Sequence, residues 1–188
     1  GKGRDGTDDE SGYGDDPYHI YQRDYKGSFH TTGDSESQTI ADSGCGPAAA
    51  ASLLRMYGKD GDMNNAVNYA LNNKYKEVDG GTYPQYFNDY LNKNGISTNS
   101  NADNNDVVNN LIHNKPVILM GRDSTNSGKT PYGSKYSHYV VARGLDKNGN
   151  VIVEDSEDKN GSTRYSLADT LNNSSVRITT GKGQYGRA

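Results

Sequence analysis

The sequence predicts an α+β domain in which an N-terminal helical part packs on a C-terminal antiparallel sheet. Apolar residues recur at helical spacing between positions 47 and 114, whereas after position 115 they form short runs separated by turn residues. Helices that precede the strands, instead of alternating with them, are typical of α+β domains, whose two parts share a core.

The clearest predicted helix runs from Pro47 to Tyr57, because proline is favoured in a first helical turn, alanine supports the helix, and Gly58 ends it. The next helix is predicted from the apolar positions between Met63 and Asn73. The remaining helical signals are a Thr82-x-x-Gln85 capping box whose helix ends at Gly95, and Asp103 to Asn114 with Val107, Val108, Leu111 and Ile112 facing inward.

The strands are predicted from apolar, β-branched runs. Asn148-Gly149 between two such runs predicts a hairpin turn, since this pair adopts the turn that the twist of two paired strands requires. The predicted strands are Pro116 to Met120, His138 to Gly144, Val151 to Val153 and an edge strand at Val176 to Thr179.

Charge and composition divide the chain into three predicted regions. The net charge of −4 is carried entirely by residues 1–16, which contain six acids and two bases, so we expect a flexible acidic linker there. Residues 17–180 form the predicted domain and residues 181–188 a glycine-rich tail. Similar Gly-Lys-Gly segments at both ends suggest a domain of a longer protein.

The electroneutral body gives no reason to expect nucleic acid as a partner, because binding to phosphates requires clustered Lys and Arg. No apolar run approaches the roughly 18 to 20 residues that span a bilayer, so membrane insertion is not expected. The single cysteine excludes an internal disulfide and a multi-cysteine metal site, and we expect neither a metal nor a cofactor. The oligomeric state is not predicted.

The single cysteine, Cys45, lies between two glycines at the start of the alanine-rich helix. The positive end of a helix dipole stabilises a thiolate there, which favours a nucleophilic role. Gly44 and Gly46 are interpreted as clearing space for a substrate backbone. The alternative is a small buried residue at the start of a helix.

Three further residues complete a candidate catalytic site. His138, where a loop enters a strand, is placed to act as a base toward a thiolate. Asp155, at the end of the next strand, can accept the second imidazole N–H and fix the tautomer. Gln38, upstream of the nucleophile, can donate to an oxyanion together with the N–H of Cys45. Alternatively, the histidine is an ordinary strand-edge residue and the glutamine a surface one.

These residues belong to a set of segments whose order is informative. The segments are Gln38, Asp42-Ser43-Gly44-Cys45-Gly46-Pro47-Ala48-Ala49, Gly80-Gly81-Thr82, Asn114-Lys115-Pro116-Val117-Ile118, Ser137-His138-Tyr139-Val140-Val141, Gly144-Leu145-Asp146 and Gly149-Asn150-Val151-Ile152-Val153-Glu154-Asp155-Ser156. Over residues 38–156 they resemble the bacteriocin-processing (double-glycine) cysteine peptidases and their stand-alone relatives. The resemblance implies a papain-like fold, with Cys45 as nucleophile, His138 as base, Asp155 as orienting group and Gln38 as oxyanion donor.

Two departures from the family pattern matter. Family members often have proline after the orienting aspartate, where this chain has Ser156, so Asp146 and Glu154 remain candidates for that role. No transporter segments accompany the domain, so the stand-alone members are the better comparison and cleavage after a double-glycine leader is not implied.

The leading hypothesis is therefore a cysteine peptidase that acts on a cell-wall or leader peptide. A secreted or phage-tail module acting on bacterial peptidoglycan would place it outside the cell or in a virion. The alternatives are an acyltransferase or glutamine deamidase on the same fold, or a catalytically silent module that binds peptide.

The long loop from Gly121 to Ser137 is interpreted as substrate-facing or as a plain connection. Its Gly128-Lys129-Thr130 does not have the glycine spacing of a phosphate-binding loop. The other histidines, His19, His30 and His113, are assigned to surface or cap positions.

Overall fold

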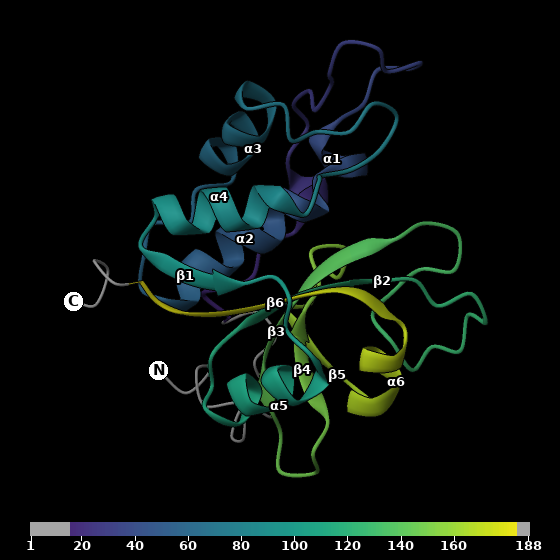
Figure 1. Ribbon diagram of the computed structural model, residues 1–188. Helices are drawn as coiled ribbons and strands as arrows, with labels where there is room; N and C mark the ends of the chain where they lie inside the picture. Colours follow the sequence, from purple (N-terminus) through teal and green to yellow (C-terminus); the bar gives the residue numbers. More distant parts are fainter. Residues whose placement is uncertain (1–15, 184–188) are drawn as a thin grey trace.

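The computed structural model describes residues 16–183, and both predicted parts are present in it (Figure 1). The N-terminal half is helical, and the predicted helix at residues 47–57 begins two residues earlier, at Cys45. The elements of this half are the 3-10 turn η2 (Gln22–Asp24), α1 (Ile40–Ser43), α2 (Cys45–Met56), α3 (Met63–Asn72) and α4 (Gln85–Lys93).

The C-terminal half is a six-stranded antiparallel sheet with the strand order β1-β6-β2-β3-β4-β5. The helices of this half, α5 and α6, lie between β1 and β2 and between β5 and β6 in the sequence. The elements are β1 (Ile96–Asn99), α5 (Asn104–Ile112), β2 (Val117–Gly121), β3 (His138–Leu145), β4 (Val151–Glu154), β5 (Ser162–Tyr165), α6 (Leu167–Asn172) and β6 (Ser174–Lys182).

The sheet differs from the prediction at its C-terminal strand. Val176 to Thr179 is not an edge strand, because β6 pairs with β2 on one side and with β1 on the other. β6 also extends to Lys182, so the first two residues of the predicted tail belong to the sheet. Residues 184–188 of that tail and residues 1–15 of the predicted acidic linker lie outside the described residues. The sequence did not predict β1, β5 or α6.

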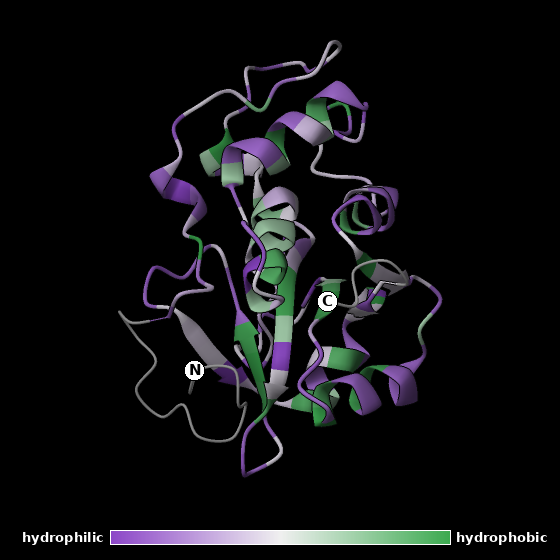
Figure 2. Cartoon of the chain, turned by 90° about the vertical axis from the view of Figure 1, so that its left-hand side faces the viewer, coloured by the Kyte–Doolittle hydropathy of each residue, from purple (hydrophilic) through white to green (hydrophobic). Residues whose placement is uncertain are grey.

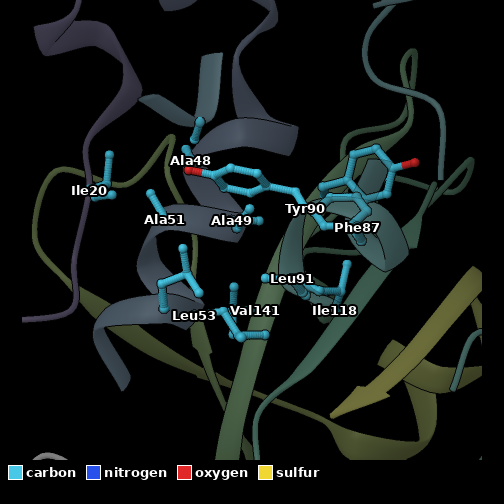
Figure 3. Close-up of a cluster of buried hydrophobic side chains, with 14 of the residues drawn as sticks. Ile20, Ala48, Ala49, Ala51, Leu53, Phe87, Tyr90, Leu91, Ile118 and Val141 are labelled. Carbon is cyan, nitrogen blue, oxygen red and sulfur yellow. The ribbon is translucent and has the colours of Figure 1, made fainter. Parts of the chain in front are cut away.

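The sheet separates two hydrophobic cores, because neighbouring residues of a strand point to opposite faces. Ile118 and Val141 face α2 and α4, whereas Val117 and Val140 face α5 and α6. Figure 2 shows apolar residues along α2 and the central strands, with polar residues on the outer helices. Figure 3 shows the first core, to which α2 contributes Ala48, Ala49 and Leu53, α4 contributes Phe87 and Leu91, and the sheet contributes Ile118 and Val141.

Three predictions from local sequence signals, a hairpin turn, a capping box and the inward face of α5, can be compared with the structure. The hairpin predicted from Asn148-Gly149 is confirmed, but its loop spans residues 146–150, and of the pair only Gly149, at φ +81°, has a positive φ. The predicted capping box at Thr82 is wrong: Pro84 precedes α4, and the Thr82 hydroxyl has no hydrogen-bond partner. Of the residues predicted to face inward on α5, Ile112 is instead 60% exposed.

In the part of the chain that the structure describes, every helix is too short or too polar to span a lipid bilayer.

Candidate active site

The candidate nucleophile and base begin two elements that pack on each other. Cys45 is the first residue of α2 and His138 the first residue of β3, and α2 packs on β3. Cys45 is partly buried against the first core. Among residues 16–183 no side chain caps α2, and its first turn contains no acid, so the positive end of the helix dipole acts on the thiol.

His138 lies between Asp155 and Cys45. Its Nε2 is 2.6 Å from Asp155 Oδ1, and the backbone N–H of Glu157 donates to the same oxygen. Burial opposes the charged ring, but hydrogen bonds with Asp155 and Cys45 outweigh it, so the pKa of His138 lies well above its ordinary value. Because Asp155 uses Nε2, Nδ1 is the nitrogen left for the thiol. The structure therefore brings three of the four predicted residues together.

The three candidate carboxylates for orienting His138, those of Asp146, Glu154 and Asp155, lie at different places relative to its ring. Asp146 lies beyond the opposite end of β3, where it accepts from the N–H groups of Asn148 and Asn150 in the hairpin turn. Glu154 bonds to Arg143 and to His19. Asp155 is thus the carboxylate within hydrogen-bonding distance of His138.

Gln38, the fourth predicted residue, lies just before α1 and is half-buried. Its main-chain oxygen accepts from Phe29 N–H, and its side-chain Oε1 accepts from the Ser43 hydroxyl at 2.9 Å. The bond to Ser43 uses the oxygen of the carboxamide, so the NH₂ group is the end that has donors to offer. The side chain is tied to the turn that directly precedes Cys45.

The glycines around Cys45 serve packing inside the protein, which corrects their interpretation as open space for a substrate. A Cβ at Gly46 would lie 2.5 Å from Thr82 Oγ1, and a Cβ at Gly44 would lie 2.5 Å from the Ile40 carbonyl oxygen. Thr82 is 2% exposed, and its carbonyl accepts from the buried Tyr139 hydroxyl. The Gly80-Gly81-Thr82 loop therefore contacts both α2 and β3 beside the site.

Behind Glu154 lies a buried charged cluster that the sequence did not predict. His19 is not a surface residue: Nδ1 bonds to Glu154 Oε1 at 2.9 Å and Nε2 to the Asp158 carbonyl. Asp16, His19 and Glu154 offer ligand-type atoms within 4.8 Å of one another. The Arg143 guanidinium already supplies a positive charge there, 2.9 Å from Glu154 Oε2 and 4.0 Å from Asp16 Oδ2.

The protonation of this cluster follows from burial and contact. Burial, followed by the hydrogen bond to Glu154, raises the pKa of Asp16 to about 8. Burial lowers the pKa of His19, but the bond to Glu154 reverses this, so the pKa lies above its ordinary value. The other two histidines match the prediction: His30 is an exposed neighbour of Asp34, and His113 bonds to the Asn109 carbonyl at the end of α5.

The loop between β2 and β3 is organised around Asp123. Thr125, Ser127 and Thr130 donate hydroxyl hydrogen bonds to its carboxylate. With the N–H of Ser127 they lower the pKa of Asp123 to about 2. These contacts give residues 123–130 of the loop a defined shape.

The α+β fold is that of the papain-like class, and Cys45, His138 and Asp155 form a candidate catalytic triad on it. Comparison with known proteins then narrows the class. A Peptidase_C39-like family model matches residues 21–179, and the chain belongs to this family. No curated protein sequence matches the chain significantly.

Two solved structures share the fold at low sequence identity. The peptidase domain of Streptococcus ComA, a bifunctional ABC transporter of a quorum-sensing pathway, has a TM-score of 0.53 and 23% identity, covering 74% of this chain and 91% of that one. A protein described as a C39-like peptidase from Bacillus anthracis has a TM-score of 0.53 and 14% identity, covering 90% of this chain and 96% of that one. These likenesses confirm the predicted α+β fold, and the match to the family model confirms the predicted resemblance.

Proposed function

We propose that the protein is a cysteine peptidase that hydrolyses a peptide bond through Cys45, His138 and Asp155. The 2.6 Å contact of His138 Nε2 with Asp155 Oδ1, together with the interaction of the His138 ring with Cys45, carries this proposal. Membership of the Peptidase_C39-like family supports the same reaction class.

The proposed reaction has two stages. His138 Nδ1 takes the Sγ proton of Cys45, and Sγ attacks the carbonyl carbon, so that the π electrons move to the carbonyl oxygen. The tetrahedral intermediate collapses, the C–N bond breaks, and the leaving amine receives the proton from His138. Water then attacks the thioester with His138 as base, which releases the acid and returns the proton to Cys45.

Three further groups are proposed to assist this reaction. The Cys45 N–H and the Gln38 carboxamide donate to the oxyanion, a role that fits the attachment of Gln38 to the turn before α2. Asp155 holds the imidazole in the tautomer with its proton on Nε2, which leaves Nδ1 free to accept. This mechanism requires no metal.

The substrate is proposed to be a bacterial cell-wall peptide or a leader peptide, and the protein to act outside the cell or in a virion. The sequence surrounding this domain in its parent protein tests the setting: wall-binding repeats indicate a secreted hydrolase, tape-measure-like helices a virion, and transporter segments leader processing.

The central experiment compares the wild type with Cys45→Ala and Cys45→Ser on leader peptides and cell-wall fragments. Mass spectrometry of the products separates hydrolysis, which gives two fragments, from deamidation, which adds about one dalton, and from acyl transfer, which gives a heavier conjugate. Equal turnover by wild type and Cys45→Ala would refute catalysis by this thiol. Tight binding without turnover would support a silent binding module.

A further inference from the structure

The N-terminal segment, defined here as residues 16–24, lies along the turn that carries Asp155. Gln22 N–H donates to the Ser156 carbonyl, His19 bonds to Glu154 and to the Asp158 carbonyl, and Arg23 pairs with Glu157. The residues around Asp155 are therefore held by a part of the chain more than a hundred positions away.

Gln22 occupies the centre of this contact. It is 1% exposed, and its carboxamide makes a hydrogen bond at each end. The Ser156 hydroxyl donates to Gln22 Oε1 at 2.6 Å, and Gln22 Nε2 donates to the Ala41 carbonyl at 2.9 Å. These contacts fix the orientation of the amide, because only its oxygen can accept and only its nitrogen can donate.

The two ends of this side chain reach the two halves of the catalytic site. Ser156 directly follows Asp155, which bonds to His138, and Ala41 lies in α1, which directly precedes Cys45. One buried carboxamide thus joins the turn that orients the base to the turn that presents the nucleophile. The exposed side chain of Arg23 also connects the two turns, because it pairs with both Glu157 and Asp42. Exposed ion pairs of this kind contribute little to the free energy of folding.

We propose that Gln22 is a positioning residue that, with Ser156, sets the place of Asp155 and His138 relative to Cys45. This inference rests on the proposed peptidase function. It also gives a physical reason for the departure from the family pattern after the aspartate. Proline would stiffen the backbone at that position, whereas Ser156 has a hydroxyl through which the N-terminal segment holds the turn.

The test uses alkylation by iodoacetamide, which reports on Cys45 alone because it is the only cysteine in the chain. The rate is measured against pH for wild type, Gln22→Ala, Gln22→Glu and Ser156→Ala. Glutamate keeps an oxygen for Ser156 but has no NH₂ to donate to Ala41, so it separates the two ends of the link.

We expect Gln22→Ala and Ser156→Ala to lower the alkylation rate at neutral pH and kcat on a peptide by on the order of tenfold, with KM little changed, because a small displacement of a catalytic group slows chemistry more than binding. The midpoint of the rise in alkylation rate with pH, at which the Cys45 thiolate forms, should move to higher pH, because a loosely held Asp155 supports the imidazolium, and through it the thiolate, less well.

The matched control is Ser52→Ala. The Ser52 hydroxyl donates to the Tyr18 carbonyl at 2.7 Å, so this buried bond joins the same N-terminal segment to α2 instead of to the Asp155 turn. We expect Ser52→Ala to lower the free energy of unfolding by about as much as Ser156→Ala does, and to leave the alkylation profile unchanged. If Gln22→Ala does not fold, Ser156→Ala gives the same readout after loss of one hydroxyl.

The outcomes distinguish this proposal from the one it rests on. If Cys45 of the wild type reacts no faster than a free cysteine at neutral pH, the proposed peptidase function fails. If wild-type Cys45 is activated and the Gln22 and Ser156 variants keep its profile while losing stability, Gln22 is only structural and the positioning role is refuted.

Discussion

Gly46→Ala tests whether the glycine after the nucleophile is required by internal packing. The added Cβ would lie 2.5 Å from Thr82 Oγ1 and 2.6 Å from Thr82 Cβ, closer than atoms in van der Waals contact. Overpacking of this kind costs about 1–3 kcal/mol, and replacing a helical glycine with alanine returns up to about 1 kcal/mol. We therefore expect the free energy of unfolding to fall by roughly 1–2 kcal/mol.

Urea unfolding measures this loss, and two further variants identify its cause. Gly81→Ala is the matched control, because a Cβ at Gly81 would meet nothing within 4 Å. Thr82→Gly removes the obstructing side chain, so in a double-mutant cycle with Gly46→Ala it should recover about 1–2 kcal/mol. A Gly46→Ala protein as stable as Gly81→Ala, or additive effects in the cycle, would refute the packing argument.

Asp155→Asn removes a negative charge from His138, so the pKa of His138 falls and the alkaline limb of kcat/KM moves to lower pH. Asp16→Asn removes an acid whose pKa is about 8 when folded but about 4 when unfolded. The folded state holds the extra proton, so stability declines as pH rises between these values, and urea titrations of the variant should show a shallower decline. Asp123→Ala removes the acceptor of three hydroxyl groups, so limited proteolysis between residues 121 and 137 should become faster.

Each of these three expectations can fail separately. An unshifted alkaline limb in Asp155→Asn would mean that this carboxylate does not set the pKa of His138. An equally steep decline in Asp16→Asn would place the linked proton on another group, such as His19. Unchanged proteolysis of Asp123→Ala would mean that the loop keeps its shape without the carboxylate.

Local patterns in the sequence predicted the elements that carry the proposed triad. Cys45 and His138 stand at the starts of a helix and a strand with strong signals, and Asp155 follows a short apolar strand. The resemblance to a known family then linked these positions. β1 and β5 were not predicted because each has only four residues, and most of these residues are polar, so neither strand has the apolar run that marks a strand in a sequence.

The contacts around the triad could not be predicted in the same way, because they depend on residues far apart in the sequence. The Gln22–Ser156 bond joins positions 134 residues apart, and nothing local marks that glutamine as buried. Gly46 was misinterpreted for the same reason: Thr82, which fills the space beside it, belongs to a separate loop. The charge of His19 also depends on distant partners, chiefly Glu154.

Because β6 lies between β1 and β2, the sheet stays divided until residues 174–182 have left the ribosome. Before then β1 has no neighbouring strand and β2 has an open edge. Cys45, His138 and Asp155 are all synthesised earlier, so a growing chain holds the whole proposed triad before it holds the strand that completes its support. We therefore expect the proposed peptidase activity to arise only at the end of the domain's synthesis, when non-local strand pairing completes the fold.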